Sequence, residues 1–128
     1  MDYSKLSDFE INCSIAEMTG HMPLSEEQGY AGLQESNITA AIVRGPRKIG
    51  GFDPCNEPTD AWPIVVENKI SLVWIAETSR WCASHGGNAE SEYWGWDECP
   101  DVHHESINPL RAAMIVFLMM HESDQSTS

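Results

Sequence analysis

The sequence predicts an α+β fold in which a small antiparallel sheet packs with about three helices in a sandwich. Helical spacing appears near both ends and once in the middle of the chain, and short segments rich in β-branched and aromatic residues lie between. At 128 residues the chain has the length of one domain. We expect residues 1–122 to form that domain and residues 123–128 to be a flexible polar tail.

The first predicted helix covers residues 6–20. Ser7 and Glu10 form an S-x-x-E capping box, in which both side chains accept hydrogen bonds from free backbone N–H groups at the helix start. Gly20 suits the left-handed conformation that often follows the last helical turn. The residues expected on one apolar face are Ile11, Ile15 and Met18.

Residues 21–35 are rich in turn formers and are expected to form a loop. After it, residues 37–44 and 47–52 predict a hairpin around the Gly45-Pro46 turn. Residues 60–68 have helical spacing, and a start near Thr59 or Asp60 would place Pro63 in the first turn, where proline is tolerated.

Residues 69–77 and 80–84 predict a second pair of strands across a short connection. Residues 92–96 favour a further strand, whereas residues 98–106 are expected to form a polar, acidic loop. Asn108 and Pro109 mark the cap and first residue of the last helix. Residues 110–120 are apolar nearly all round, so this helix is expected to be buried against the sheet or sandwiched in the core, with a polar tail from His121.

The charge balance limits the function classes. The chain has twenty acidic residues and only seven Lys and Arg, which gives a formal charge of −13. This negative charge disfavours direct binding to nucleic acid or to anionic membranes. No apolar run approaches the roughly 20 residues of a membrane span, and the first residues lack the pattern of a signal peptide. The four cysteines, Cys13, Cys55, Cys82 and Cys99, are widely spaced and are expected to be reduced thiols of a cytosolic protein.

The common catalytic and nucleotide-binding motifs do not occur in the sequence, among them G-x-S-x-G, the P-loop, H-E-x-x-H and the dinucleotide fingerprint. Acidic residues are so frequent that any pair chosen for acid–base catalysis would be arbitrary. We therefore expect a binding protein without a cofactor and not an enzyme.

Three blocks carry a family resemblance: residues 3–12 (YSKLSDFEIN), residues 52–56 with 60–68 (FDPCN and DAWPIVVEN), and residues 108–120 (NPLRAAMIVFLMM). In this order they resemble the NinX-like family of temperate-phage accessory proteins. The resemblance implies a phage origin, a small helix-sheet-helix sandwich in the cytoplasm of the infected bacterium, and no established catalytic residues. Residues 20–50 and 80–107 match no family block, so function is expected in those stretches.

Basic and aromatic residues are the candidates for ligand binding. Arg44, Arg47 and Lys48 flank the Gly45-Pro46 turn and could hold a phosphate, although a solvated hairpin tip is the blander interpretation. Arg111 lies in the first turn of the last helix, where a cation opposes the helix dipole and needs an anion: an internal carboxylate or a ligand's phosphate. The aromatic candidates for base stacking are Trp81, Tyr93, Trp94 and Trp96, whereas Trp62 and Trp74 are expected in the core.

A metal site is a weaker hypothesis. Cys82, His85, Cys99 and His103 give a C-x2-H and C-x3-H pattern of zinc ligand types, with His104 as an alternative to His103. Because the first spacing is short and the segment lies outside the family blocks, we favour ordinary thiols and surface histidines.

Two function classes remain. The first is counter-defence by sequestration of a small nucleotide-type immune signal of the host, which predicts a concave pocket with at least one arginine and one aromatic residue, at the interface of a homo-oligomer. The second is an acidic, DNA-mimicking inhibitor of a basic host or phage DNA-processing protein, which predicts a contiguous carboxylate face. We rank sequestration first.

Overall fold

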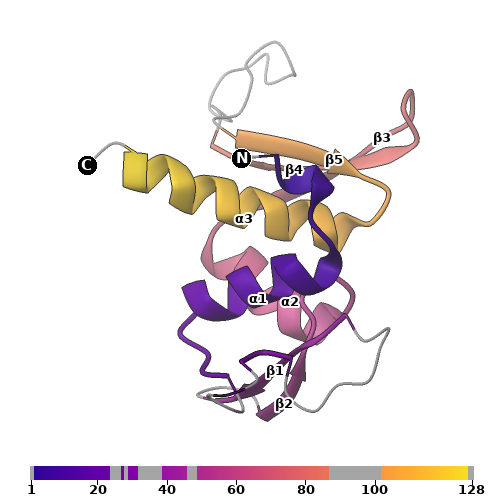
Figure 1. Ribbon diagram of the computed structural model, residues 1–128. Coiled ribbons are helices and arrows are strands. Elements are labelled where there is room, and N and C mark those ends of the chain that lie inside the picture. The colour runs from indigo at the N-terminus through magenta and orange to yellow at the C-terminus, as the bar shows by residue number, and fades with distance from the viewer. Residues whose placement is uncertain are drawn as a thin grey trace.

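The structure is a computed structural model that describes residues 2–23, 27, 29–31, 39–45, 49–86 and 102–126, with the side chains of residues 123–126 left out. Its elements, in chain order, are a 3-10 helix η1 (Tyr3–Lys5), α1 (Asp8–Met18), β1 (Ala41–Arg44), β2 (Ile49–Phe52), α2 (Pro58–Glu67), β3 (Ser71–Ile75), β4 (Arg80–His85), β5 (Val102–Ser106) and α3 (Pro109–Ser126) (Figure 1).

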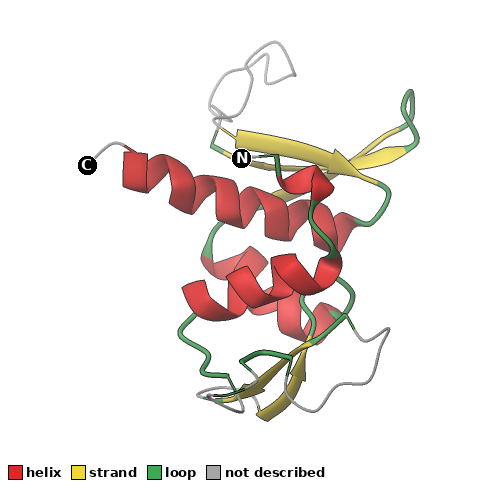
Figure 2. Ribbon diagram, viewed as in Figure 1, coloured by secondary structure: helices red, strands yellow, loops and turns green. Residues whose placement is uncertain are grey.

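The elements form stacked layers, so the predicted α+β class is confirmed. Figure 2 shows the three-stranded sheet on one side of α3, with α1 and α2 on the other side and the β1–β2 hairpin beyond them. The described strands are thus divided between two antiparallel sheets, in the orders β1-β2 and β3-β4-β5. None of the helices in the described part of the chain is long and apolar enough to cross a membrane.

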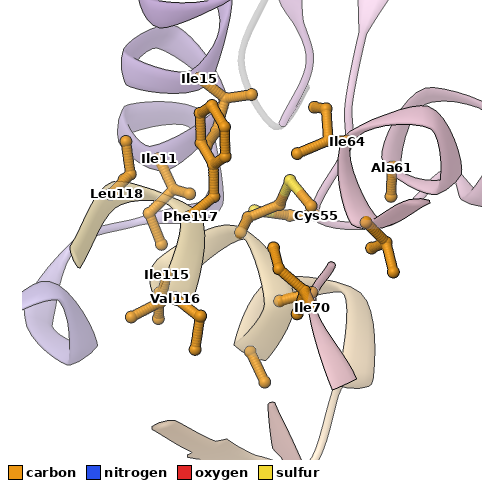
Figure 3. Close-up of a cluster of buried hydrophobic side chains, with 14 of the residues drawn as sticks. Ile11, Ile15, Cys55, Ala61, Ile64, Ile70, Ile115, Val116, Phe117 and Leu118 are labelled. Atoms are coloured by element: carbon orange, nitrogen blue, oxygen red, sulfur yellow. The ribbon is translucent and has the colours of Figure 1, made fainter. Parts of the chain in front are cut away.

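Helix α3 lies at the centre of these layers. Residues 112–118 are all buried, because α3 contacts β4 and β5 on one side and α1 and α2 on the other. Figure 3 shows Ile115, Val116, Phe117 and Leu118 among apolar side chains from the other helices. The predicted sandwiched helix is therefore confirmed. The segment expected to be a polar tail from His121 is helical as far as Ser126.

The predicted start of the first helix is confirmed. Ser7 Oγ accepts from the Glu10 N–H at 3.1 Å, and Glu10 Oε1 accepts from the Ser7 N–H at 3.1 Å, so both halves of the capping box are present. Ile11 and Ile15 are fully buried, but Met18 is 40% exposed and does not share their environment. Gly20 has φ +79°, the left-handed conformation that its position predicted.

Helix α2 begins earlier than expected. Glu57 precedes it, Pro58 is its first residue, and Pro63 lies inside the helix, so the predicted place of Pro63 in the first turn is wrong. Because proline has no N–H, Pro63 cannot donate the backbone hydrogen bond that the Thr59 carbonyl would normally accept from the next turn.

Both predicted strand pairs form, with Val43 opposite Gly50 and Val73 opposite Cys82. The expected acidic loop is wrong at its end, because residues 102–106 form β5, in which Glu105 lies opposite Cys82. Its sequence, VHHES, has low strand propensity, but alternate residues are half-buried and α3 packs against the strand. Tertiary packing therefore overrides local propensity here.

Replacing Ser7 with alanine removes the hydroxyl acceptor at the start of α1. We expect the free energy of unfolding, measured by urea denaturation, to fall by about 1 kcal/mol. Ser71→Ala, at an exposed position of β3, is the matched control and should change it by less than about 0.5 kcal/mol. Equal effects of the two substitutions would contradict the capping role.

Candidate functional site

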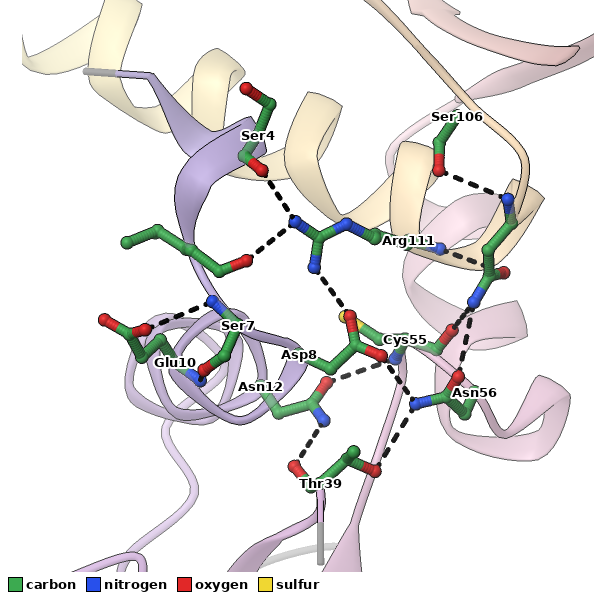
Figure 4. A network of polar contacts seen from close by, with 12 residues as sticks. Ser4, Ser7, Asp8, Glu10, Asn12, Thr39, Cys55, Asn56, Ser106 and Arg111 are labelled. Carbon is green, nitrogen blue, oxygen red and sulfur yellow. Dashed lines mark hydrogen bonds and ion pairs between the residues drawn. The ribbon is translucent and has the colours of Figure 1, made fainter. Parts of the chain in front are cut away.

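Arg111 is held by internal partners. Its Nη1 donates to Asp8 Oδ1 at 2.6 Å, and its Nη2 donates to the carbonyl oxygens of Leu6 at 2.7 Å and Ser4 at 3.3 Å (Figure 4). The Arg111 and Asp8 side chains are only 18% and 25% exposed. The anion that compensates Arg111 at the start of α3 is therefore an internal carboxylate, the first of the two alternatives that its position raised.

A hydrogen-bond network continues from Asp8 into the segment that precedes α2. Asn56 Nδ2 donates to Asp8 Oδ2 at 3.1 Å and to Asp53 Oδ1 at 3.1 Å. Asn12, fully buried, donates to Asp53 Oδ1 at 2.6 Å and accepts from the Cys55 N–H at 3.1 Å. These bonds join α1 to the α2 approach without leaving the Asn12 amide unsatisfied.

Asn108 ties α3 into the same network. Its Oδ1 accepts from the Leu110 N–H at 2.9 Å, which confirms the predicted cap, and its Nδ2 donates to the Cys55 carbonyl at 2.7 Å. Asn108 thus satisfies a free backbone N–H at the start of α3 and the Cys55 carbonyl in the segment before α2.

The other predicted ligand residues are dispersed. Arg44 is exposed at the end of β1, where it lines a hollow of about 400 Å³ with Gly20, Met22 and Gly45. Trp81 lies on the three-stranded sheet, edge-to-face with Trp74 at 5.5 Å between ring centroids. The expectation that Trp62 and Trp74 are core residues is wrong, since they are 60% and 50% exposed. Five predicted residues lie outside the described part of the chain: Arg47, Lys48, Tyr93, Trp94 and Trp96.

The proposed zinc set does not assemble. Cys82 and His85 are three positions apart on β4, and because side chains alternate along a strand they point to opposite faces of the sheet. His103 lies opposite Ser84, on the face of Cys82, and His104 lies opposite Ala83, on the other face. Cys99 lies outside the described residues, among which no cluster of three or more metal-binding side chains occurs.

A groove of about 450 Å³ lies where α1, α2, β2 and α3 meet. Two aromatic and imidazole pairs form part of its wall: His21 stacks on Phe52 with centroids 4.5 Å apart, and His121 meets Phe117 edge-on at 4.4 Å. The remaining lining residues are Met18, Thr19, Thr59, Asp60, Pro63, Ile64, Glu67 and Asn68.

His21 is positioned by its neighbour Thr19. Thr19 Oγ1 lies 2.7 Å from His21 Nδ1, 2.8 Å from the Ile15 carbonyl oxygen and 3.3 Å from the Ala16 carbonyl oxygen. These contacts hold the imidazole at the end of α1, against the groove.

The groove is electronegative. Asp60 and Glu67 line it, and so do Thr19 and Asn68, the C-terminal caps of α1 and α2. Helix C-termini carry partial negative charge, so these two helix ends add to the carboxylates. No lysine or arginine occurs among the described lining residues. The groove thus suits a planar group that donates hydrogen bonds more than it suits an anion.

No single sequence motif indicates this groove, because its lining comes from four separate segments. Only Pro63 and Gly20 stood out locally, as an unusual helix residue and as a helix end next to the wall.

Comparison with protein families assigns the chain to a family. Residues 2–121 match the family described as Bacteriophage P22, NinX. The chain belongs to this NinX family. Comparison with curated proteins and with solved structures gives no match. Membership indicates a phage accessory protein.

The three blocks that resembled the NinX family meet in the structure. Asp8, Asn56 and Arg111 come from different blocks and are joined by hydrogen bonds. The blocks of this NinX-family protein therefore meet in its internal network. They also supply much of the groove wall, including Asp60 and Glu67, whereas His21 comes from outside them.

Arg111→Leu leaves the Asp8 carboxylate and two carbonyl groups without their donor. We expect the free energy of unfolding to fall by about 2 kcal/mol in urea denaturation. Lys5→Leu is the control, because the Lys5–Asp2 pair is 4.0 Å long and its side chains are 83% and 56% exposed. That substitution should change stability by less than about 0.5 kcal/mol. Similar losses for the two variants would contradict the role of Arg111.

Cys13 and Cys55 should resist alkylation in the folded protein. Burial and the nearby Glu10 carboxylate raise the pKa of Cys13 to about 11, and burial raises the pKa of Cys55 further. At pH 8 both are therefore thiols and not the reactive thiolates. Iodoacetamide treatment with mass-spectrometric mapping should modify them in urea and leave them intact without it. Rapid modification of either in the folded protein would contradict the partial burial of Cys13 or the full burial of Cys55.

Proposed function

We propose that this NinX-family protein binds and sequesters a small nucleotide-type ligand without transforming it, in the cytoplasm of the infected host, where the ligand is an immune signal. The groove between α1, α2 and α3 carries the proposal. Its volume of about 450 Å³ is in the range of small-molecule sites, and its wall combines aromatic rings with a few polar groups.

A nucleobase suits the chemistry of this groove. Its planar ring can lie against Phe52, Phe117 or the paired imidazoles, and its amino groups can donate to the Asp60 and Glu67 carboxylates. We therefore expect bases with an exocyclic amino group to bind more tightly than uracil.

Binding without chemistry is the simpler use of these groups. The Thr19 hydroxyl lies next to the His21 imidazole, as a nucleophile lies next to its base, but it donates its proton to the Ile15 carbonyl. Within the described lining, this bond from the Thr19 hydroxyl to the backbone supports a proposal of binding and not of nucleophile activation.

A basic protein is the second candidate partner. The formal charge of −13 favours association with a cationic surface, and the electronegative groove could accept an arginine or lysine side chain. Such an inhibitor would bind its partner with strong dependence on salt, whereas a nucleobase in the groove would be much less sensitive. Pull-down of basic polypeptides and titration with nucleosides separate the two candidates.

Two substitutions test the groove. His121→Ala removes an edge-on ring contact and Glu67→Gln removes a carboxylate from the wall. Each should weaken binding of adenine, guanine or cytosine nucleotides about tenfold or more in isothermal titration calorimetry. His103→Ala and Glu77→Gln are the controls, because both residues are exposed and outside the groove. If the groove variants bind as tightly as the controls, the ligand does not use the groove.

A further inference from the structure

We infer that the hollow beside Arg44 receives the phosphate of the ligand whose base lies in the helix groove. The inference rests on the proposed function and makes it more specific: the ligand is a nucleotide and not a nucleoside. The hollow measures about 400 Å³, and its described lining is Gly20, Met22, Arg44 and Gly45.

One short segment separates the hollow from the groove. Thr19 and His21 line the groove, while Gly20 and Met22 line the hollow. Gly20 is exposed and has no side chain, and a Cβ atom placed there would meet nothing within 4 Å. Gly20 therefore contributes no side chain that would stand between the two depressions.

The backbone fixes Arg44 against this segment. The Arg44 N–H donates to the Met22 carbonyl at 2.9 Å, and the Met22 N–H donates to the Gly45 carbonyl at 2.9 Å. These paired bonds hold the end of β1 beside the chain that leaves α1. The guanidinium thus extends from a positioned backbone and not from an untethered loop.

Electrostatics assigns the two parts of the ligand to the two depressions. Asp60, Glu67 and the ends of α1 and α2 repel a phosphate from the groove. Arg44 is exposed, and no carboxylate of the described residues forms an ion pair with it, in contrast to Arg111 with Asp8. A guanidinium can donate two parallel hydrogen bonds to phosphate oxygens. The phosphate therefore belongs at Arg44 and the base in the groove.

The experiment compares each nucleoside with its 5′-monophosphate. Adenosine, guanosine, cytidine and uridine and their monophosphates are titrated into the full chain by calorimetry at low salt, with inorganic phosphate as a further probe. For the best-bound base, the monophosphate should bind about tenfold more tightly than the nucleoside. Arg44→Ala should reduce the affinity for the monophosphate to that for the nucleoside and leave nucleoside binding unchanged.

Arg80→Ala is the matched control, since Arg80 is also exposed but lies on the other sheet. It should bind both ligands as the unmodified protein does, and thermal unfolding verifies that both variants fold. If the monophosphate gains nothing, or Arg44→Ala weakens nucleoside and monophosphate equally, the phosphate site is wrong and the groove proposal stands. If no nucleoside or nucleotide binds, the proposed function itself fails, and the phosphate site with it.

Discussion

The structure depends on one constraint, which is that α3 has no polar face over residues 112–118. Such a helix must be covered on every side, and a single sheet can cover only one. The three-stranded sheet encloses one side and α1 with α2 encloses the other, so the remaining layers are arranged around this helix. The β1–β2 hairpin then covers the far side of the helix pair, chiefly through α1.

The network around Arg111 fixes the orientation of the layers that the apolar core holds together. Hydrophobic contacts are not directional, whereas the bonds from Arg111 to Asp8 and from Asn108 to Cys55 require one register of α3 against α1 and the α2 approach. These residues fall in the blocks that resemble the NinX family, and the same blocks also supply Phe52, Asp60, Glu67 and Phe117 of the groove wall. Because Arg111 bonds to groups inside the protein, it is no longer the simplest candidate to bind a ligand's phosphate.

Features that depend on neighbouring residues could be predicted from the sequence. The Ser7–Glu10 capping box, the Asn108 cap and both antiparallel strand pairs follow from local rules and are present. β5 could not be predicted, because histidine, glutamate and serine form a strand there only through pairing with β4 and packing under α3. The zinc hypothesis was wrong for a related reason. The spacing of Cys82 and His85 along the chain does not define the directions of their side chains until the segment is known to be a strand, in which the two point to opposite faces of the sheet.

The groove illustrates why a charged sequence is a poor guide to where a ligand binds. The sequence draws attention to arginines, yet the groove between α1, α2, β2 and α3 is lined in part by carboxylates, imidazoles and helix C-termini. An electronegative groove and an exposed arginine that has no ion pair among the described residues are contradictory only if a ligand has one kind of surface. A nucleotide has two, a base that carries hydrogen-bond donors and an anionic phosphate, and the two depressions that match them are lined by neighbouring residues of the segment from Thr19 to Met22. The acidic body and a phosphate-bearing ligand are therefore compatible, provided that the two halves of the ligand are bound apart.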